Sequence, residues 1–234
     1  MSHSLLLKLR GPMQAWGDAS RFADRHTRSI PTKSGVLGLL AAAEGRRRTD
    51  PIEDLVQLKF AVRTDQPGTL LRDYQTAQAW QTGGKTALST RYYLADAVFV
   101  AAVESTDRAV LEGIEAALKA PRFPLFLGRR SCPAGPDLVL GILDLPAVDA
   151  LRAEPWHASA HHRRSRPRTV ELPVHRDGSP EEDGEQRRDV PVSFDQRHRQ
   201  YGWRNVVRER TGVIIENPDG AENTDPFFEA VISA

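Results

Sequence analysis

Apolar and polar residues follow two different periods along the first part of this chain. Where they alternate, or where a short apolar run is bounded by turn residues, the pattern predicts β-strands. Such stretches lie at residues 4–8, 58–63, 92–104, 123–127 and 138–143. Apolar residues three or four positions apart predict two helices. The first begins at Pro31 and Thr32 and stops at Gly45, and the second begins at Asp107 and stops at Pro121.

These elements follow one another in the order β-α-β-β-α-β, which is that of the ferredoxin-like fold and of RNA recognition motifs. The sequence therefore predicts an α+β domain over residues 1–146. Right-handed crossovers would place both helices on one face of the sheet and leave the opposite face, or the loops at its rim, to a ligand. Residues 69–91 are polar and rich in glycine and threonine, and we expect them to form a projecting β-hairpin insertion.

The composition changes after Pro146. Residues 152–190 are dominated by arginine, histidine, proline, glycine and acidic residues, and are expected to form long exposed loops. Further strands are expected at residues 190–194, 205–207 and 213–215. The sequence thus predicts a small, loop-rich and β-rich C-terminal lobe over residues 147–234.

The first turn of the first predicted helix carries candidate chemistry. It combines backbone N–H groups and the positive end of the helix dipole with Lys33, Thr32 and Ser34, a set that suits a phosphate. Gly35 and Gly38 each cost about 1 kcal/mol relative to alanine inside a helix, a cost offset if another backbone must come close. The alternative is a buried helix whose glycines touch a sheet and whose lysine lies in solvent.

Charge is unevenly distributed in a chain whose net charge is only +1. Residues 1–50 contain nine Lys or Arg against four Asp or Glu, which gives this part a net charge of +5. A localised basic region indicates a site for a polyanion, with a solvated charged face as the alternative. A single cysteine, Cys132, fits a reducing compartment and is interpreted as structural. With no signal-peptide pattern and no apolar run of membrane length, the expected location is cytoplasmic.

Two other motif-like runs are rejected as sites. Residues 84–86 resemble the end of a phosphate-binding P-loop, but position 79 lacks the required glycine and no hydrophobic strand precedes the run. His157, His161 and His162 have helical spacing, but the arginines that follow would repel a dication. No metal and no cofactor is expected.

The remaining candidates point to RNA. Arg129 and Arg130 follow a predicted strand and could hold phosphates through forked hydrogen bonds. Stacking on unpaired bases is the role considered for Trp16, Tyr74 and Trp80. His26 is a candidate general base for metal-independent RNA cleavage, with a simple RNA or solvent contact as the alternative.

Four runs of residues, taken in order, resemble a known family. They are Gly-Pro-Met-Gln-Ala-Trp-Gly at 11–17, Pro-Thr-Lys-Ser-Gly followed by Leu-Gly-Leu-Leu within 31–40, Arg-Asp-Tyr-Gln-Thr at 72–76 and Leu-Gly-Arg-Arg-Ser-Cys-Pro at 127–133. As a set they resemble the Cas-five-type subunits of type I-E CRISPR Cascade complexes. The resemblance implies a repeat-associated (RAMP) ferredoxin-like protein that caps the 5′ handle of the CRISPR RNA (crRNA). It also implies that the hairpin at about 69–91 is a thumb pressed over the first guide nucleotides.

The same resemblance implies partners and a role. The partners would be the CasC backbone and the large CasA subunit, with CasB and CasE in the same complex, target DNA reached through the guide, and no membrane. The tyrosine, lysine and histidine set of RNA-cutting relatives cannot be placed here, and Gln75 stands where relatives often have histidine. The implied role is therefore a non-catalytic scaffold for DNA interference. The alternatives are a metal-independent endoribonuclease that processes repeat RNA and a purely structural subunit. RNA-binding roles are expected for Gln14, Trp16, Gly17, Arg21, Arg25, His26, Arg28, Thr32, Lys33, Ser34, Arg72, Tyr74, Lys85, Arg91, Arg129, Arg130 and Ser131.

Overall fold

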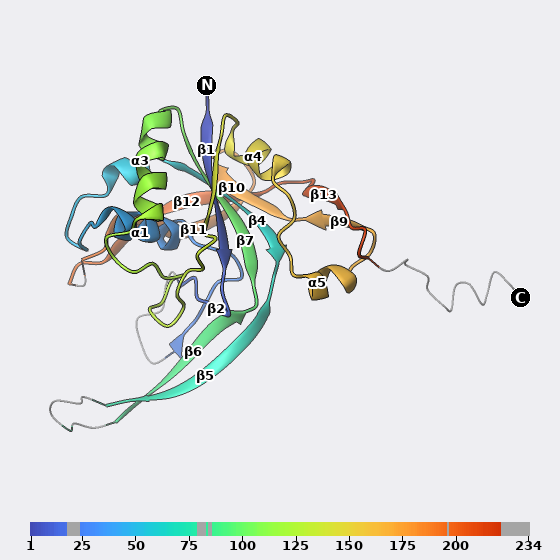
Figure 1. Cartoon of the computed structure of the whole chain (residues 1–234). Coiled ribbons are helices and arrows are strands. Elements are labelled where there is room, and N and C mark those ends of the chain that lie inside the picture. Colours follow the sequence, from blue (N-terminus) through green and yellow to red (C-terminus); the bar gives the residue numbers. More distant parts are fainter. Residues whose placement is uncertain (18–23, 79–82, 84–85, 196, 221–234) are drawn as a thin grey trace, which may run out of the picture.

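The computed structural model describes residues 1–17, 24–78, 83, 86–195 and 197–220, and places one large antiparallel sheet at the centre of the molecule (Figure 1). In the described residues its strands follow the order β11-β12-β10-β4-β7-β1-β8, and each neighbouring pair is antiparallel. The strands are β1 (His3–Arg10), β4 (Lys59–Gln66), β7 (Val98–Ser105), β8 (Val139–Leu143), β10 (Val174–Gly178), β11 (Glu185–Ser193) and β12 (Gln200–Arg208).

Both faces of this sheet are covered. Leu5 and Leu7 of β1 pack toward the core under helices α1 (Lys33–Glu44) and α3 (Arg108–Lys119), whereas Leu6 packs on the opposite face. There it meets helix α4 (Ala147–Ala153) and a small sheet of β9 (Thr169–Leu172) and β13 (Val213–Glu216). The second face is therefore not left open to a ligand, because α4 and the small sheet cover it, and only the loops at the rim remain of the expected alternatives. Burial on both sides also explains why β1 and β7 read as nearly continuous apolar runs.

The predicted boundaries of both long helices are confirmed. Thr32 caps α1 by accepting a hydrogen bond from the backbone of Gly35, and Gly45 ends it in the left-handed region at φ 82°. A Cβ at Gly35 would come within 2.8 Å of the Trp16 ring, and one at Gly38 would lie 3.4 Å from the Phe194 ring. The close neighbours of these glycines are thus aromatic rings and not another backbone or a sheet.

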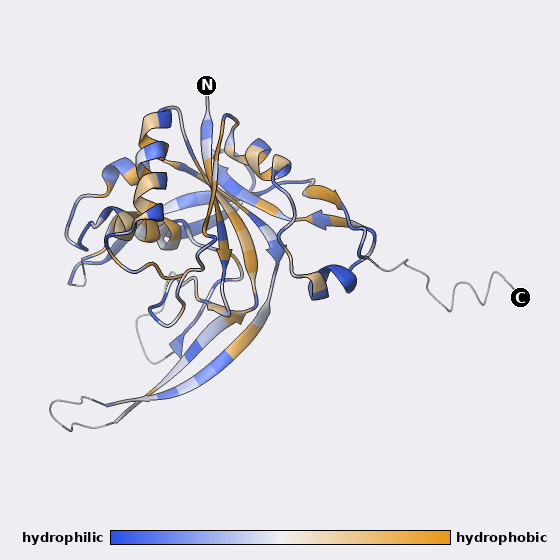
Figure 2. Cartoon of the chain, in the orientation of Figure 1, coloured by the Kyte–Doolittle hydropathy of each residue, from blue (hydrophilic) through white to orange (hydrophobic). Residues whose placement is uncertain are grey.

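The predicted projecting hairpin is also confirmed, although it is longer than expected. Strands β5 (Thr69–Ala77) and β6 (Ala87–Ala95) pair in continuous antiparallel register and extend away from the body of the molecule (Figure 1). Hydrophilic and hydrophobic residues both occur along it (Figure 2), and Leu70, Leu71, Tyr74 and Leu88 are exposed on it. Its base carries two short strands, β2 (Met13–Gln14) and β3 (Asp24–Arg25), both paired with β6. The single strand predicted at 92–104 is in fact β6 and β7, separated near Asp96, whose φ is 55°.

Two further expectations are wrong. Residues 123–127 form no strand and contribute only an isolated bridge between Phe126 and Pro133. Residues 152–190 hold the end of α4, helix α5 (Ala160–Arg164), β9, β10 and most of β11, and are not long loops. Because β10, β11 and β12 continue the central sheet beyond β4, the boundary expected at residue 146 coincides with no break in its hydrogen bonding.

The remaining short helix is α2 (Glu53–Val56). No helix in the described part of the chain is both long and apolar enough to cross a membrane.

Candidate nucleic-acid interface

A basic groove of about 1140 Å³ lies where the N-terminal half of the chain meets the C-terminal strands. Its walls come from the loop at 25–28, the turn at 128–131 and the strands β6, β11 and β12. No aspartate or glutamate is among the described residues that line it. The lining arginines, which we call the groove arginines, are Arg25, Arg28, Arg48, Arg91, Arg129, Arg130, Arg188 and Arg199. A concave surface lined by one sign of charge concentrates ligands of the opposite sign.

Arg129 holds two walls of the groove together. Its guanidinium donates to the carbonyl oxygens of Tyr92 at 3.0 Å and Arg25 at 2.8 Å, and it lies 4.7 Å from the centre of the Tyr93 ring. The turn before it requires glycine, since Gly128 has φ 89° and an added Cβ would lie 1.7 Å from the Ala15 carbonyl oxygen. These contacts hold the loop at 25–28, the turn at 128–131 and strand β6 at a fixed spacing.

Aromatic rings lie beside these cations. The His26 ring stacks on Tyr92, with 5.0 Å between ring centres and 10° between planes. The Tyr93 hydroxyl lies 3.4 Å from the Ser131 hydroxyl. Burial opposes ionisation of the Tyr93 phenol, but Ser131 and the neighbouring arginines outweigh it and lower the pKa of this group. The neighbouring Cys132 is buried, and burial raises the pKa of its thiol, which disfavours the reactive thiolate.

The side chains of Gln14 and Trp16 are fully buried, so an RNA contact from either residue is left only to its backbone. The Gln14 amide donates to the carbonyl oxygens of Leu9 at 2.9 Å and Ala97 at 2.7 Å, and accepts from the Trp16 indole at 3.1 Å. With its polar group paired inside the core, Trp16 packs against Gly35 and cannot stack on a base.

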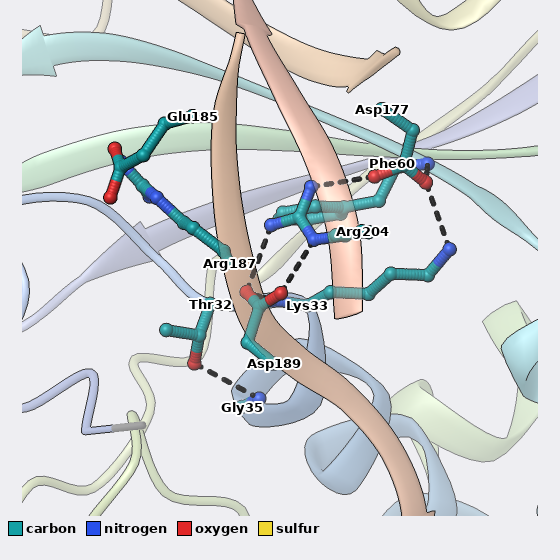
Figure 3. Close-up of polar contacts among 9 residues, drawn as sticks. All are labelled: Thr32, Lys33, Gly35, Phe60, Asp177, Glu185, Arg187, Asp189 and Arg204. Atoms are coloured by element: carbon teal, nitrogen blue, oxygen red, sulfur yellow. Dashed lines mark hydrogen bonds and ion pairs between the residues drawn. The ribbon is translucent and has the colours of Figure 1, made fainter. Parts of the chain in front are cut away.

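The phosphate site expected at the start of α1 is also wrong, because the protein fills it with its own carboxylates (Figure 3). The backbone N–H of Lys33 donates to Asp189 at 2.9 Å, and its ammonium pairs with Asp177 at 2.8 Å. Arg204 lies between the two acids, bound twice to Asp189 at 2.6 and 2.9 Å and once to Asp177 at 2.6 Å. This buried network joins α1 to β10, β11 and β12. Lys33 lies in this network and not in solvent. Its side chain is therefore neither free for a phosphate nor solvent-exposed, which were the two alternatives expected from the sequence.

Thr32 and Ser34, also expected to bind RNA, are buried at the same helix start. The Thr32 hydroxyl is engaged as the helix cap. Both residues border a smaller hollow of about 490 Å³, which shares Arg48, Arg130 and Tyr201 with the groove. At most they line the floor of the basic surface.

Residues 4–207 match the family described as CRISPR-associated protein (Cas_Cas5). The chain belongs to this family. A curated relative, the CRISPR system Cascade subunit CasD of Escherichia coli (strain K12), is 41% identical over 160 residues, which cover 60% of this chain and 71% of the relative.

Two solved structures agree with the assignment of this chain to the Cas5 family. A crystal structure of a Cas protein superposes with a TM-score of 0.71 at 35% identity, covering 94% of this chain and 98% of the other. A chain of a CRISPR RNA-guided surveillance complex superposes with a TM-score of 0.73 at 29% identity, covering 98% of each chain. The architecture described above is therefore shared across nearly the whole length of these chains.

The structure of this Cas5 family member separates the predicted site residues into groups. Those that line the groove are Gly17, Arg25, His26, Arg28, Arg91, Arg129, Arg130 and Ser131. Arg72 and Tyr74 are exposed on the hairpin, where Tyr74 is 62% exposed. Arg21, Trp80 and Lys85 lie outside the described residues.

Prediction from the sequence missed the wall formed by β11 and β12. A register shift between Arg187 and Val190 marks a bulge in β11, in which Arg188 reaches the groove while Asp189 is buried under α1. Arg199, Tyr201 and Trp203 complete this wall. No local sequence motif predicts that these residues line the groove, because their position depends on where the C-terminal strands join the sheet.

Proposed function

We propose that this chain binds the 5′ handle of crRNA as a subunit of a type I-E Cascade complex. The observation that carries the proposal is the groove, with its arginines, adjacent aromatic rings and absence of acidic side chains among the described lining residues. Arginine binds phosphate through a fixed fork of donors, and single-stranded RNA bases stack on aromatic faces. The 41% identity to the E. coli Cascade subunit CasD supports the same assignment.

The strand order β4-β7-β1-β8, with α1 and α3 on one face, fits the ferredoxin-like arrangement that the β-α-β-β-α-β order predicted. We propose that the β5–β6 hairpin is the thumb of this fold and lies over the guide. CasC and CasA would be its partners in the assembly, with CasB and CasE in the same complex and target DNA reached through the guide.

We propose that the chain binds RNA without cutting it. Cleavage of RNA without a metal needs one group to take the 2′-hydroxyl proton and another to protonate the leaving oxygen. In the described lining, His26 is packed flat against Tyr92 and its charged neighbours are arginines, which stay protonated and cannot exchange a proton near neutral pH. This arrangement supplies positive charge and a stacking surface and no matched acid–base pair.

Incubation of the purified full-length chain with labelled repeat RNA in EDTA tests this proposal. We expect retention of the RNA at low salt, weaker retention at high salt, and no cleavage product on a denaturing gel. A specific product that is formed by the wild type and lost in His26→Ala would establish the endoribonuclease alternative and reject the non-catalytic role. Failure of the wild type to retain RNA at any salt concentration would reject RNA binding itself.

A further inference from the structure

One wall of the groove carries an exposed aromatic side chain that packing among the described residues does not explain. Trp203 lies on β12 and is 66% exposed, although tryptophan is usually largely buried. It lines the groove beside Arg188, Arg199 and Tyr201. Trp156, for comparison, uses its indole N–H to bond the Asp65 carbonyl oxygen at 2.9 Å. No such internal role is found for Trp203 among the described contacts.

The strand that carries Trp203 is anchored on both sides of it. Arg188 of β11 donates to the carbonyl oxygen of Tyr201 at 3.0 Å. Arg204, the next residue along β12, is held by Asp189 and Asp177 in the buried network (Figure 3). This backbone is already ordered before a ligand binds. A ligand that stacks on the indole therefore pays little entropic cost for ordering the strand.

The charges around Trp203 indicate the kind of ligand. Arginines lie beside it, and no acidic side chain is among the described groove residues. Single-stranded nucleic acid combines a flat base with a phosphate in every nucleotide, and proteins bind it with aromatic side chains along a positive groove. An apolar protein surface would cover the indole equally well, but it would remove the neighbouring guanidinium groups from water without giving them anionic partners.

We infer that Trp203 forms a stacking site for an unpaired base of the RNA in the groove. The inference rests on the proposed function. It assigns a base contact to β12, while the arginines of the same groove would contact the phosphates. Stacking tolerates any base, so Trp203 contributes affinity for single strands and not a choice of sequence.

The test compares two labelled strands of equal length, an oligoadenylate and an abasic ribose-phosphate strand, binding to the full-length chain. Trp203→Ala is expected to weaken oligoadenylate binding roughly 5- to 100-fold and to leave affinity for the abasic strand unchanged. Trp203→Phe keeps an aromatic face and should retain most of the affinity, whereas Trp203→Leu should lose it. The slope of log affinity against log salt should stay the same in Trp203→Ala, because no phosphate contact is removed.

Ile214→Ala is the matched control, since Ile214 is 64% exposed on β13 and does not line the groove. Wild-type affinity for oligoadenylate in Trp203→Ala would overturn the stacking site while leaving the proposed function intact. A wild type that binds neither strand would overturn the proposed function, and this inference with it. A Trp203→Ala chain that binds RNA normally but fails to enter the assembled complex would place Trp203 in a protein interface and reject the stacking site.

Discussion

Replacement of Arg25, Arg48 and Arg130 by glutamine is expected to weaken the binding of single-stranded RNA about 50-fold at 0.15 M salt. The three side chains are exposed and reach the groove from three separate segments. If each contacts one phosphate, their loss reduces the slope of log affinity against log salt by about 2, since each single-strand contact contributes about 0.7. Filter binding across a range of salt concentrations measures both quantities.

The control for this variant removes the same charge elsewhere. Arg152, Arg164 and Arg210 are exposed and do not line the groove. Their joint replacement by glutamine changes the net charge equally and should leave the salt slope near that of the wild type. An equal loss of RNA affinity in the two triple variants would show that binding depends only on the overall charge of the protein. That result would contradict a localised site.

Arg63→Met is expected to lower the free energy of unfolding by about 3–5 kcal/mol, since it leaves a buried charge without its partner. Arg63 and Asp65 are essentially unexposed and form a pair at 2.7 Å on β4. The same guanidinium donates to the carbonyl oxygens of Leu151, Glu154 and Pro155, which joins β4 to α4 and to the residues directly after it. For a chain of this length the melting temperature should fall by roughly 10 °C, measurable by circular dichroism.

Two further variants distinguish the effect of breaking this buried ion pair from the effect of removing any charged side chain. The double variant Arg63→Met with Asp65→Leu removes both charges and should be more stable than Arg63→Met alone, although the three carbonyl oxygens stay unpaired. Arg108→Met breaks exposed pairs with Glu112 and Asp144 and should leave the melting temperature close to that of the wild type, because exposed pairs are screened by water and salt. A melting temperature of Arg63→Met within 2 °C of the wild type would contradict the anchoring role.

The parts of the fold that the sequence predicts well are those specified by neighbouring residues. The limits of α1 follow from Thr32 and Gly45, which act on the helix ends within one turn. Asp107 specifies the start of α3 in the same way. The hairpin follows from a polar insertion between two apolar strands, although its exact length depends on the break at Asp96.

The parts that the sequence predicts poorly depend on contacts between distant segments. The start of α1 has the local features of an anion site, but the anion is Asp189, which lies 156 residues from Lys33. Trp16 stands among turn residues, yet its burial follows from the space that Gly35 leaves for its ring. The strands β10 to β12 lie in an arginine- and histidine-rich stretch, and the pairing of β10 with β4 makes all three part of the central sheet.

Photochemical crosslinking tests most directly the claim that this groove holds the 5′ end of the guide. The chain would be assembled with its partner subunits and with crRNAs that carry 4-thiouridine at one handle position at a time, and the crosslinked peptides mapped by mass spectrometry. We predict crosslinks to peptides that contain residues 25–28, 128–131 and 199–203, which form the groove walls. Crosslinks confined to the far side of the sheet, on α5 and β9, would contradict the account.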